Sequence, residues 1–444
     1  MSPTLPAVEV FPKRCKGTLA CMRVCPTDAI RVRNGKVSIK DELCIDCGDC
    51  IVACPEGAIQ ACTDGWESIE KFRFKVAITS PTLFGQFPST ITPADIVDGL
   101  LAIGFDAVHD QSVESAIFNR AIRDYLKDYR GPYPLISSVC PVVVRMIQVS
   151  YPDMVGQVIP LQPPREISGR EVKRIYSEKL GLKPEEIGAV YISPCPAKMA
   201  SIRRPAEGSE SHLDLAIGIR EIYNPLLAAI TKRKKASPAR HEVLPESGMY
   251  TSVLLSLAIT GGESHALHQD RAISVAQLPS IIQVIEDIEK GKIRNVEFLE
   301  CRACTSGCIG GPLTVDNRFV ARSKLLTLID LIDKADRGIE ELLEERYQQG
   351  SYYLEKPLEP RPIATNKGSI FEQIEQVKIK EDLMKLLPGI DCGLCGSPRC
   401  EVFAEDVAKG EVEASACVML SAETCRKVHQ LYRPKNLKID KKEK

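Results

Sequence analysis

The stretch "LECRACTSGCIGGP", Leu299–Pro312, carries three cysteines within eight residues and ends in a Gly-Gly-Pro turn. The apolar run just before it predicts a buried strand, which would deliver the thiols at its carboxyl end. Cys304 and Cys308 alone rarely complete a metal site, because thiolate sites in proteins commonly use four ligands. We therefore expect the missing ligands elsewhere in the chain.

Cysteine usage is the unusual feature of the composition. The chain has 18 cysteines in 444 residues, bunched at 15–62, near the middle and at 392–425. The N-terminus shows no secretory pattern, so we expect a cytoplasmic protein in which thiols stay reduced. Clustered cysteines of this kind indicate metal binding, whereas inert core thiols would be scattered.

Charge and hydropathy exclude several classes of partner. The formal net charge is −1, which gives no reason to expect nucleic acid or an anionic membrane as the main partner. No apolar run approaches the length of about 20 residues that spans a membrane. The length suffices for two to four domains.

Predicted strands and helices alternate from Phe72 onward. The segments are a strand at 72–78, a helix at 93–103, a strand at 105–110 and a helix at 112–129. This alternation, which continues to about residue 348, predicts a parallel α/β domain. A Pro-rich segment at 352–368 is expected to be a linker to a final helix-rich part.

Two cysteine runs lie near the N-terminus. "CIDCGDCIVACP" (44–55) is the C-x2-C-x2-C-x3-C-P run of bacterial ferredoxins, in which the fourth cysteine ligates the other [4Fe–4S] cluster. The first run, "CKGTLACMRVCP" (15–26), has Thr18 where a further cysteine is expected. The crossed pattern assigns Cys15, Cys21 and Cys54 to cluster one, and Cys25, Cys44, Cys47 and Cys50 to cluster two.

The gap at Thr18 leaves three alternatives open. The first site holds a [3Fe–4S] cluster, or a [4Fe–4S] cluster whose fourth ligand is oxygen, water or Cys62, or no cluster. A missing thiolate should change both potential and stability.

A third motif lies near the C-terminus. Cys392, Cys395, Cys400 and Cys417 form a C-x2-C-x4-C-x16-C pattern, with Cys425 outside it. Zinc is one candidate for four cysteines. The stretch resembles a small iron–sulfur domain of anaerobic electron-transfer and carbon-monoxide-metabolising proteins, and this resemblance favours [4Fe–4S].

Three predicted strands of the middle domain each end near a thiol. Cys140 ends "YPLISSVC", Cys195 ends "IGAVYISPC", and Cys304 and Cys308 follow the third strand. Ligands of parallel α/β sheets bind at the carboxyl ends of the strands. The sequence therefore predicts a four-thiolate site assembled from three loops.

The same loops resemble the signature loops of the iron-only, or [FeFe], hydrogenases. They read "SSVCP" (137–141), "SPCPAK" (193–198) and "ECRACTSGCIGGP" (300–312), and "GFDAVHD" (104–110) also fits. The ferredoxin-like front and the C-terminal domain resemble the sensory, non-prototypical branch. The resemblance implies a two-lobed parallel-sheet H-cluster domain between an α+β ferredoxin-like domain and a small, mainly helical iron–sulfur domain.

The resemblance also implies roles for matching residues. Cys140, Cys195, Cys304 and Cys308 would hold a [4Fe–4S] cluster, and Cys308 would bridge to a diiron subcluster with carbon monoxide, cyanide and a bridging dithiolate. Lys198 matches the lysine that contacts a cyanide. Gly310 and Gly311 would let the backbone approach the cofactor.

The chain departs from the pattern of catalytic members at three positions. Val139 replaces a cysteine that shuttles protons, and Ser201 replaces a glutamate. Arg302 replaces a methionine at the cofactor, where it would shift the cluster potential or fill the space of the diiron unit. An alternative proton route needs carboxylates, for which Glu246 and Glu300 are the candidates.

The resemblance implies hydrogen and protons as substrates and a redox or signalling protein as partner. We expect a low-turnover, hydrogen-sensing hydrogenase, or alternatively an electron-transfer subunit without the diiron unit. The expected parts are a ferredoxin-like domain (1–65), an H-cluster domain (70–350), a linker (351–369), a four-cysteine domain (370–432) and a basic tail (433–444).

Overall fold

The computed structural model describes residues 7–205, 210–236, 251–332, 339–350, 352–361 and 369–431. Its internal contacts divide the chain into two compact units. The first unit comprises Met1–Val8, Ile45–Gly48 and Ala61–Arg361, and the second comprises Glu9–Cys44, Asp49–Gln60 and Pro362–Lys444.

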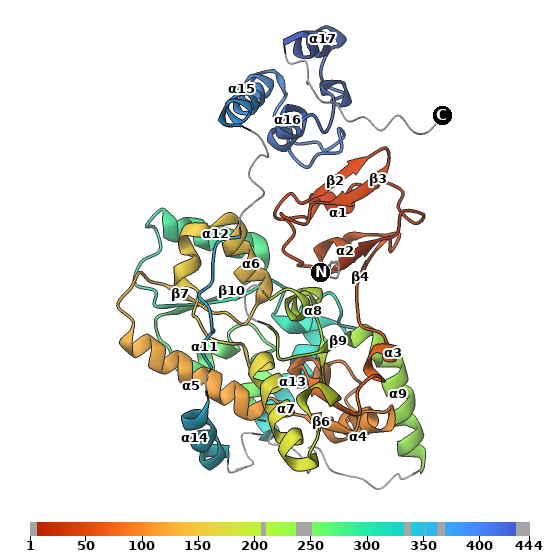
Figure 1. Ribbon diagram of the computed structural model, residues 1–444, viewed down its shortest axis with the longest axis vertical. Helices are drawn as coiled ribbons and strands as arrows, with labels where there is room; N and C mark the ends of the chain where they lie inside the picture. The colour runs from red at the N-terminus through yellow and green to blue at the C-terminus, as the bar shows by residue number, and fades with distance from the viewer. Residues whose placement is uncertain are drawn as a thin grey trace. The chain divides into compact units, whose positions relative to one another are not determined.

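The first unit contains two parallel sheets, whose elements are labelled in Figure 1. One has the order β6-β5-β8-β9 and the other the order β10-β11-β7. The strands are β5 (Phe74–Thr79), β6 (Ala107–His109), β7 (Leu135–Ile136), β8 (Ile187–Ser193), β9 (Leu215–Gly218), β10 (Ala272–Ala276) and β11 (Phe298–Arg302). Two parallel sheets confirm the predicted α/β class.

Helices connect these strands. They are α3 (Trp66–Ile69), α4 (Pro93–Ala102), α5 (Ser112–Asp128), α6 (Pro141–Ser150), α7 (Pro164–Leu180), α8 (Pro196–Arg203), α9 (Ile219–Ala236), α10 (Ser252–Ser256), α11 (Gly262–Leu267), α12 (Leu278–Glu289), α13 (Arg318–Ile332) and α14 (Ile339–Gln349). Short 3-10 turns lie at Pro81–Gly85, Pro152–Gln157, Pro184–Glu186 and Cys308–Gly310. The helices expected at 93–103 and 112–129 are thus present as α4 and α5.

Each sheet is buried on both faces, as parallel sheets require. Along β8, Val190 and Ile192 face a core that includes α4 and α9. Tyr191 faces the opposite core, with Val172 of α7 and Met199 of α8. In the second sheet, alternate residues of β11 likewise divide between a core with α6 and α12 and a core with α5. The β-strand period of two therefore sets which side chains face which helix.

Part of the segment expected as a linker is packed. Tyr353 forms a bridge with Leu161, the Leu354 amide donates to Pro160 O at 2.9 Å, and the Arg361 amide donates to Gln148 O at 3.0 Å. Residues 352–361 therefore lie within the first unit. The rest of the expected linker, apart from Ser369, and all of the basic tail fall outside the described residues.

The second unit holds the cysteine motifs of both chain ends. Its elements are β1 (Val8–Val10), α1 (Ala20–Arg23), β2 (Ile30–Arg33), β3 (Lys36–Ile39), α2 (Asp49–Ala53), β4 (Ile59–Ala61), α15 (Ile370–Leu386), α16 (Cys400–Ala408) and α17 (Ala422–Leu431). β2 and β3 are antiparallel and joined at Asn34 and Gly35, both with positive φ, as a tight hairpin requires.

A buried charge cluster joins three elements of the first unit. Glu114 of α5 lies 3.3 Å from His109 Nε2 and 3.3 Å from Arg346 of α14, and its side chain is fully buried. Burial alone would lower the pKa of His109, but Glu114 raises it. Burial alone would raise the pKa of Glu114, but His109 lowers it. The net effect raises the pKa of His109 and lowers the pKa of Glu114, so each group favours the charged form of the other.

Glu114→Gln should lower the free energy of unfolding of the first unit by about 3 kcal/mol, because it leaves two partly buried cations without their carboxylate. The Glu114 carboxylate contributes to stability at pH values above its unfolded-state pKa. The His109 side chain contributes at pH values below its own unfolded-state pKa. The pair therefore stabilises fully between about pH 4.3 and 6.5 and less outside this window. Urea unfolding followed by fluorescence of Trp66, the sole tryptophan, measures this loss.

The matched control is Glu344→Gln on α14, because Glu344 also pairs with an arginine but is 56% exposed. Solvent screens such a pair, and we expect little change in the midpoint. Equal midpoints for the two variants would show that the buried cluster does not stabilise the fold.

Candidate metal centres

The cysteines of the first unit stand where strands end. Cys140 follows β7 and directly precedes α6, and Cys195 follows β8 and directly precedes α8. A proline occupies the first position of both helices, where its missing amide and fixed φ are tolerated. Cys304 and Cys308 follow β11, and the Gly307 amide donates to Cys304 O at 3.1 Å within their turn.

The two sheets bring thiols from different loops together. Burial raises the pKa of Cys195 to about 11, Lys198 opposes this rise, and the nearby charges of Cys140 and Cys308 add to it. Thiols that influence one another in this way lie close together although they are up to 168 positions apart in the sequence. Three of the four predicted thiolate ligands are thus gathered from three loops, with Cys304 on the same turn as Cys308.

A buried lysine stabilises the thiolate of Cys308. Lys198 Nζ lies 3.5 Å from Cys308 Sγ, and the Lys198 residue is 7% exposed. Burial alone would raise the pKa of Cys308, but Lys198 and Arg302 lower it. Burial alone would lower the pKa of Lys198, but Cys308 raises it. Lys198 is therefore held as an ammonium beside a thiolate.

A cavity of about 400 Å³, part of it open to solvent, lies next to Cys308. Its lining includes Val139, Arg165, Tyr191, Lys198 and Cys308. Among the described residues that line it, none is a carboxylate or a histidine. A thiolate at one side and two cations in the wall match a cofactor that takes a sulfur bridge and carries anionic ligands. The donor set therefore fits the expected diiron group.

The glycines of the third loop allow close packing of backbone on backbone. A Cβ on Gly310 would lie 2.1 Å from Thr305 O, and a Cβ on Gly311 would lie 2.5 Å from Pro194 O. Gly307 has φ +96°, and a Cβ there would lie 2.6 Å from Ala258 O. The close approach expected of Gly310 is thus made to its own loop, and that of Gly311 to the loop that carries Cys195.

Arg302 does not fill the cavity, which corrects one of its two expected roles. Its guanidinium is buried and pairs with Glu263 at 2.8 Å and with Glu300 at 3.5 Å. β11 directs Arg302 to the face opposite Cys301, whose buried thiol belongs to a core. The positive charge still acts on Cys308 and Cys140, so an influence on cluster potential fits the structure.

Sequence reasoning missed Glu263, the second carboxylate of this network. It is buried and accepts a hydrogen bond from Ser137 Oγ at 2.8 Å, three residues before Cys140. Burial raises its pKa to about 7, while Arg302 acts against the rise. Its sequence context, "GGES", gives no sign of a buried acid, and only the position of α11 against β11 shows it.

The structure describes only one of the two carboxylates, Glu246 and Glu300, that are expected on a proton route. Glu246 lies outside the described residues. Glu300 is buried and accepts hydrogen bonds from the Gly261 amide at 3.0 Å and from the Ser264 amide at 2.9 Å. Glu300 therefore fixes the loop before α11. Ser201, which replaces a glutamate of the pattern, donates to Lys198 O at 2.8 Å.

Cysteines of both N-terminal runs lie near one another in the second unit. Burial raises the pKa of Cys21, and Cys54 and Cys15 add to the rise. Burial also raises the pKa of Cys50, together with Cys44, Cys25 and Cys21. Each set thus combines cysteines from both runs. Cys47 falls in the segment Ile45–Gly48 of the first unit, where it packs against the core that contains Cys195.

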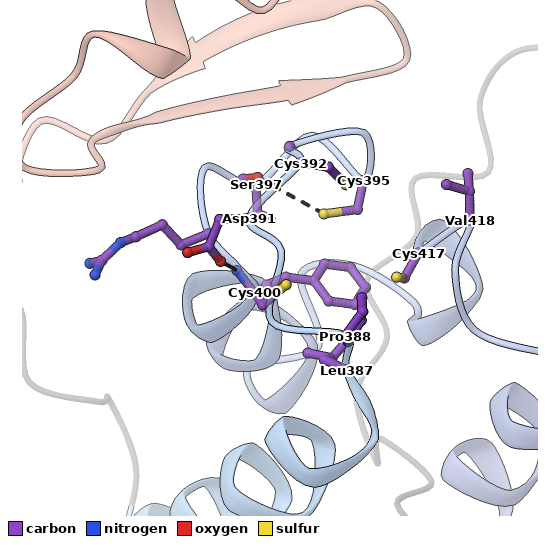
Figure 2. Close-up of a pocket in the computed structure, with 12 residues that line it drawn as sticks. Leu387, Pro388, Asp391, Cys392, Cys395, Ser397, Cys400, Cys417 and Val418 are labelled. Carbon is purple, nitrogen blue, oxygen red and sulfur yellow. Dashed lines mark hydrogen bonds between the residues drawn. The ribbon is translucent and has the colours of Figure 1, made fainter.

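The C-terminal cysteines surround a pocket of about 320 Å³ that includes open solvent. The thiols of Cys395, Cys400 and Cys417 turn toward the same space (Figure 2). The Cys400 amide, at the start of α16, donates to Asp391 Oδ1 at 2.6 Å, which fixes the loop to the helix. The four predicted ligands, Cys392, Cys395, Cys400 and Cys417, all line this pocket.

The described residues contain neither a site for a single metal ion nor a helix that could span a membrane. No three His, Cys, Asp or Glu side chains in that part of the chain gather as they would around a single metal ion. None of its helices has the length and apolar character needed to cross a membrane.

Three protein families match separate parts of the chain. The family described as "Iron only hydrogenase large subunit, C-terminal domain" matches residues 73–270. A 4Fe-4S dicluster family matches residues 7–55, and an Fe-S cluster family matches residues 387–419. The dicluster match contains the two N-terminal cysteine runs, and the third match contains the C-terminal four-cysteine motif. These parts of the chain are iron–sulfur cluster domains.

Two curated relatives are hydrogenases. The NADP-reducing hydrogenase subunit HndD of Solidesulfovibrio fructosivorans is 26% identical over 339 residues, which are 62% of this chain and 56% of that protein. Iron hydrogenase 1 of Clostridium pasteurianum is 27% identical over 210 residues, which are 46% of this chain and 35% of that protein. The chain thus matches little more than half of the first relative and about a third of the second.

A comparison with solved structures aligns part of this chain with [FeFe] hydrogenases. An apo form of HydA1 from Chlamydomonas reinhardtii aligns over 66% of this chain and 95% of its own, with 18% identity and a TM-score of 0.47. The family matches, the hydrogenase relatives and the thiols gathered from three loops lead to one conclusion. The chain is an [FeFe]-hydrogenase-like protein with a ferredoxin-like dicluster domain before its hydrogenase-like part and an iron–sulfur domain after it.

Proposed function

We propose that this protein reversibly activates hydrogen at low turnover and serves as a hydrogen sensor that passes electrons through its iron–sulfur clusters. The observation that carries the proposal is the cavity beside Cys308, which contains two cationic side chains and is not filled by Arg302. A chain that had lost its diiron unit would not need to keep a buried lysine against this thiol, because burying a charge is costly.

The cysteines of the three loops hold the cofactor in this proposal. Cys140, Cys195, Cys304 and Cys308 would hold a [4Fe–4S] cluster, and the cavity beside Cys308 would hold a diiron unit. That unit would supply Lewis-acid chemistry for hydrogen when bound. Lys198 would donate to an anionic ligand of the unit, and Arg165 adds a second positive charge to the wall.

Slow proton transfer explains the low turnover. Hydrogen cleavage releases a proton that must leave the cavity, and Val139 provides no titratable group in the wall. The described lining also holds no carboxylate or histidine that would take over this step. A slow site that still changes its redox state with hydrogen suits a sensor, and the signal then passes to a separate redox or signalling protein.

Electrons leave by way of the ferredoxin-like cysteines. Cys47 and Ile45 pack in the same core as Cys195, with Cys140 at its edge. This packing places Cys47, a predicted ligand of cluster two, in the same core as Cys195. Cluster two is held by Cys25, Cys44, Cys47 and Cys50, and cluster one by Cys15, Cys21 and Cys54. The C-terminal [4Fe–4S] cluster is held by Cys392, Cys395, Cys400 and Cys417.

The cytoplasmic location of the protein stays a prediction.

Infrared spectroscopy on the anaerobic, artificially matured protein tests the proposal. We expect bands of metal-bound carbon monoxide and cyanide that change when hydrogen is added, because the cavity retains the groups that hold the diiron unit. Iron analysis of the same sample serves as the control for cluster loading. Full iron loading without such bands would leave the electron-transfer subunit as the function.

Lys198→Met should weaken retention of the diiron unit about tenfold or more, because a charge-assisted hydrogen bond contributes about 1.5–3 kcal/mol. The readout is the intensity of the cyanide bands relative to iron in the [4Fe–4S] clusters. Lys198→Arg keeps the charge and should retain more of the intensity. Unchanged bands in Lys198→Met would contradict the role of this lysine.

A further inference from the structure

The ferredoxin-like part and the four-cysteine domain meet inside the second unit. The Val32 amide, on the free edge of β2, donates to Gly396 O at 2.9 Å. A Cβ on Gly396 would lie 1.7 Å from Val32 O, and Gly396 has φ +78°. The backbones thus touch without room for a side chain, and the contact covers an otherwise unpaired strand edge.

A single buried carboxylate organises this contact. Asp406 of α16 is 1% exposed and accepts from Arg31 Nε at 2.6 Å and from Arg33 Nη2 at 2.7 Å. Lys40 Nζ lies 3.3 Å away, and Ser397 Oγ donates at 2.7 Å. All three cations come from the ferredoxin-like part, whereas the carboxylate comes from the four-cysteine domain.

The charges make this contact specific. A buried carboxylate without its partners would be strongly unfavourable, and so would the buried arginine Arg31. Separation of the two parts would therefore leave Asp406 and its cationic partners without their counter-charges. Arg399 and Asp28 form a further pair at the edge of the contact, with Nε and Oδ2 2.7 Å apart.

The contact also joins the loops that carry the cluster cysteines. Arg33 Nη1 donates to Cys395 O at 2.9 Å. On the other side, a Cβ on Gly393, next to Cys392, would lie 2.7 Å from the Cε atom of Met22, next to Cys21.

We propose that Asp406 fixes the four-cysteine domain on the ferredoxin-like part, so that the C-terminal cluster exchanges electrons directly with the N-terminal clusters, and that Arg33 raises its reduction potential. The inference rests on the iron–sulfur clusters of the proposed function and not on the diiron unit. One electron leaves one cluster and enters the other, and no bond forms or breaks. A nearby cation favours the more negative, reduced cluster, which raises the potential.

Arg33→Gln in the full-length, iron-loaded protein tests the tuning. Redox titration monitored by electron paramagnetic resonance should show a lower midpoint potential for the C-terminal cluster. The signal of this cluster is the one that is missing from the Cys392→Ala variant. We expect about a tenfold change in the reduction equilibrium, which is about 59 mV for one electron. The N-terminal signals report that the variant has folded.

Lys409→Gln is the matched control, because Lys409 is an exposed cation of the same domain. A shift in Arg33→Gln no larger than in this control would overturn the tuning role. Zinc in place of iron at Cys392, Cys395, Cys400 and Cys417 would overturn the whole inference. Missing carbon monoxide and cyanide bands would leave it standing, because it needs only the [4Fe–4S] clusters.

Asp406→Asn tests whether Asp406 holds the four-cysteine domain against the ferredoxin-like part. The measurement does not depend on the redox behaviour of the clusters. Hydrogen–deuterium exchange of the Val32 amide should become at least tenfold faster, since this amide loses its acceptor when the domains separate. Glu405→Gln is the control on the same helix, because Glu405 pairs with Lys380 of its own domain at 2.7 Å. Equal protection of Val32 in both variants would show that Asp406 does not hold the domains together.

Discussion

The direction of the strands is the constraint on which this protein depends. In a parallel sheet every strand delivers its next residue to the same edge. β7, β8 and β11 therefore place Cys140, Cys195 and the Cys304–Cys308 turn at a common site although they belong to two sheets. The prolines after Cys140 and Cys195 start a helix at once, so each thiol is held between a strand end and a helix beginning.

Buried charge is the second organising feature, and the buried charges of the middle site have charged partners. Lys198 lies against the Cys308 thiol, and Arg302 lies between Glu263 and Glu300. The two carboxylates compensate the arginine and direct it away from the cavity. A substitution that suggests a blocked cofactor site in the sequence is thus compatible with an open one, because its partners come from elsewhere in the fold.

The second unit follows the same rule at the contact between its two cysteine-rich parts. Asp406 is buried together with two arginines of β2 and with Lys40, which directly follows β3. A carboxylate in this position turns a domain at the far end of the sequence into a neighbour of the ferredoxin-like part.

The sequence by itself determined the cysteine motifs, the alternation of strands and helices and the resemblance to hydrogenases, because spacing and periodicity are local properties. The three loops of the middle site followed from strand ends alone. Only the tertiary structure decided the position of Arg302, the burial of Glu263 and the partners of Asp406. Arg31 and Asp406 are 375 residues apart, and no local pattern encodes which distant charge a buried group will meet.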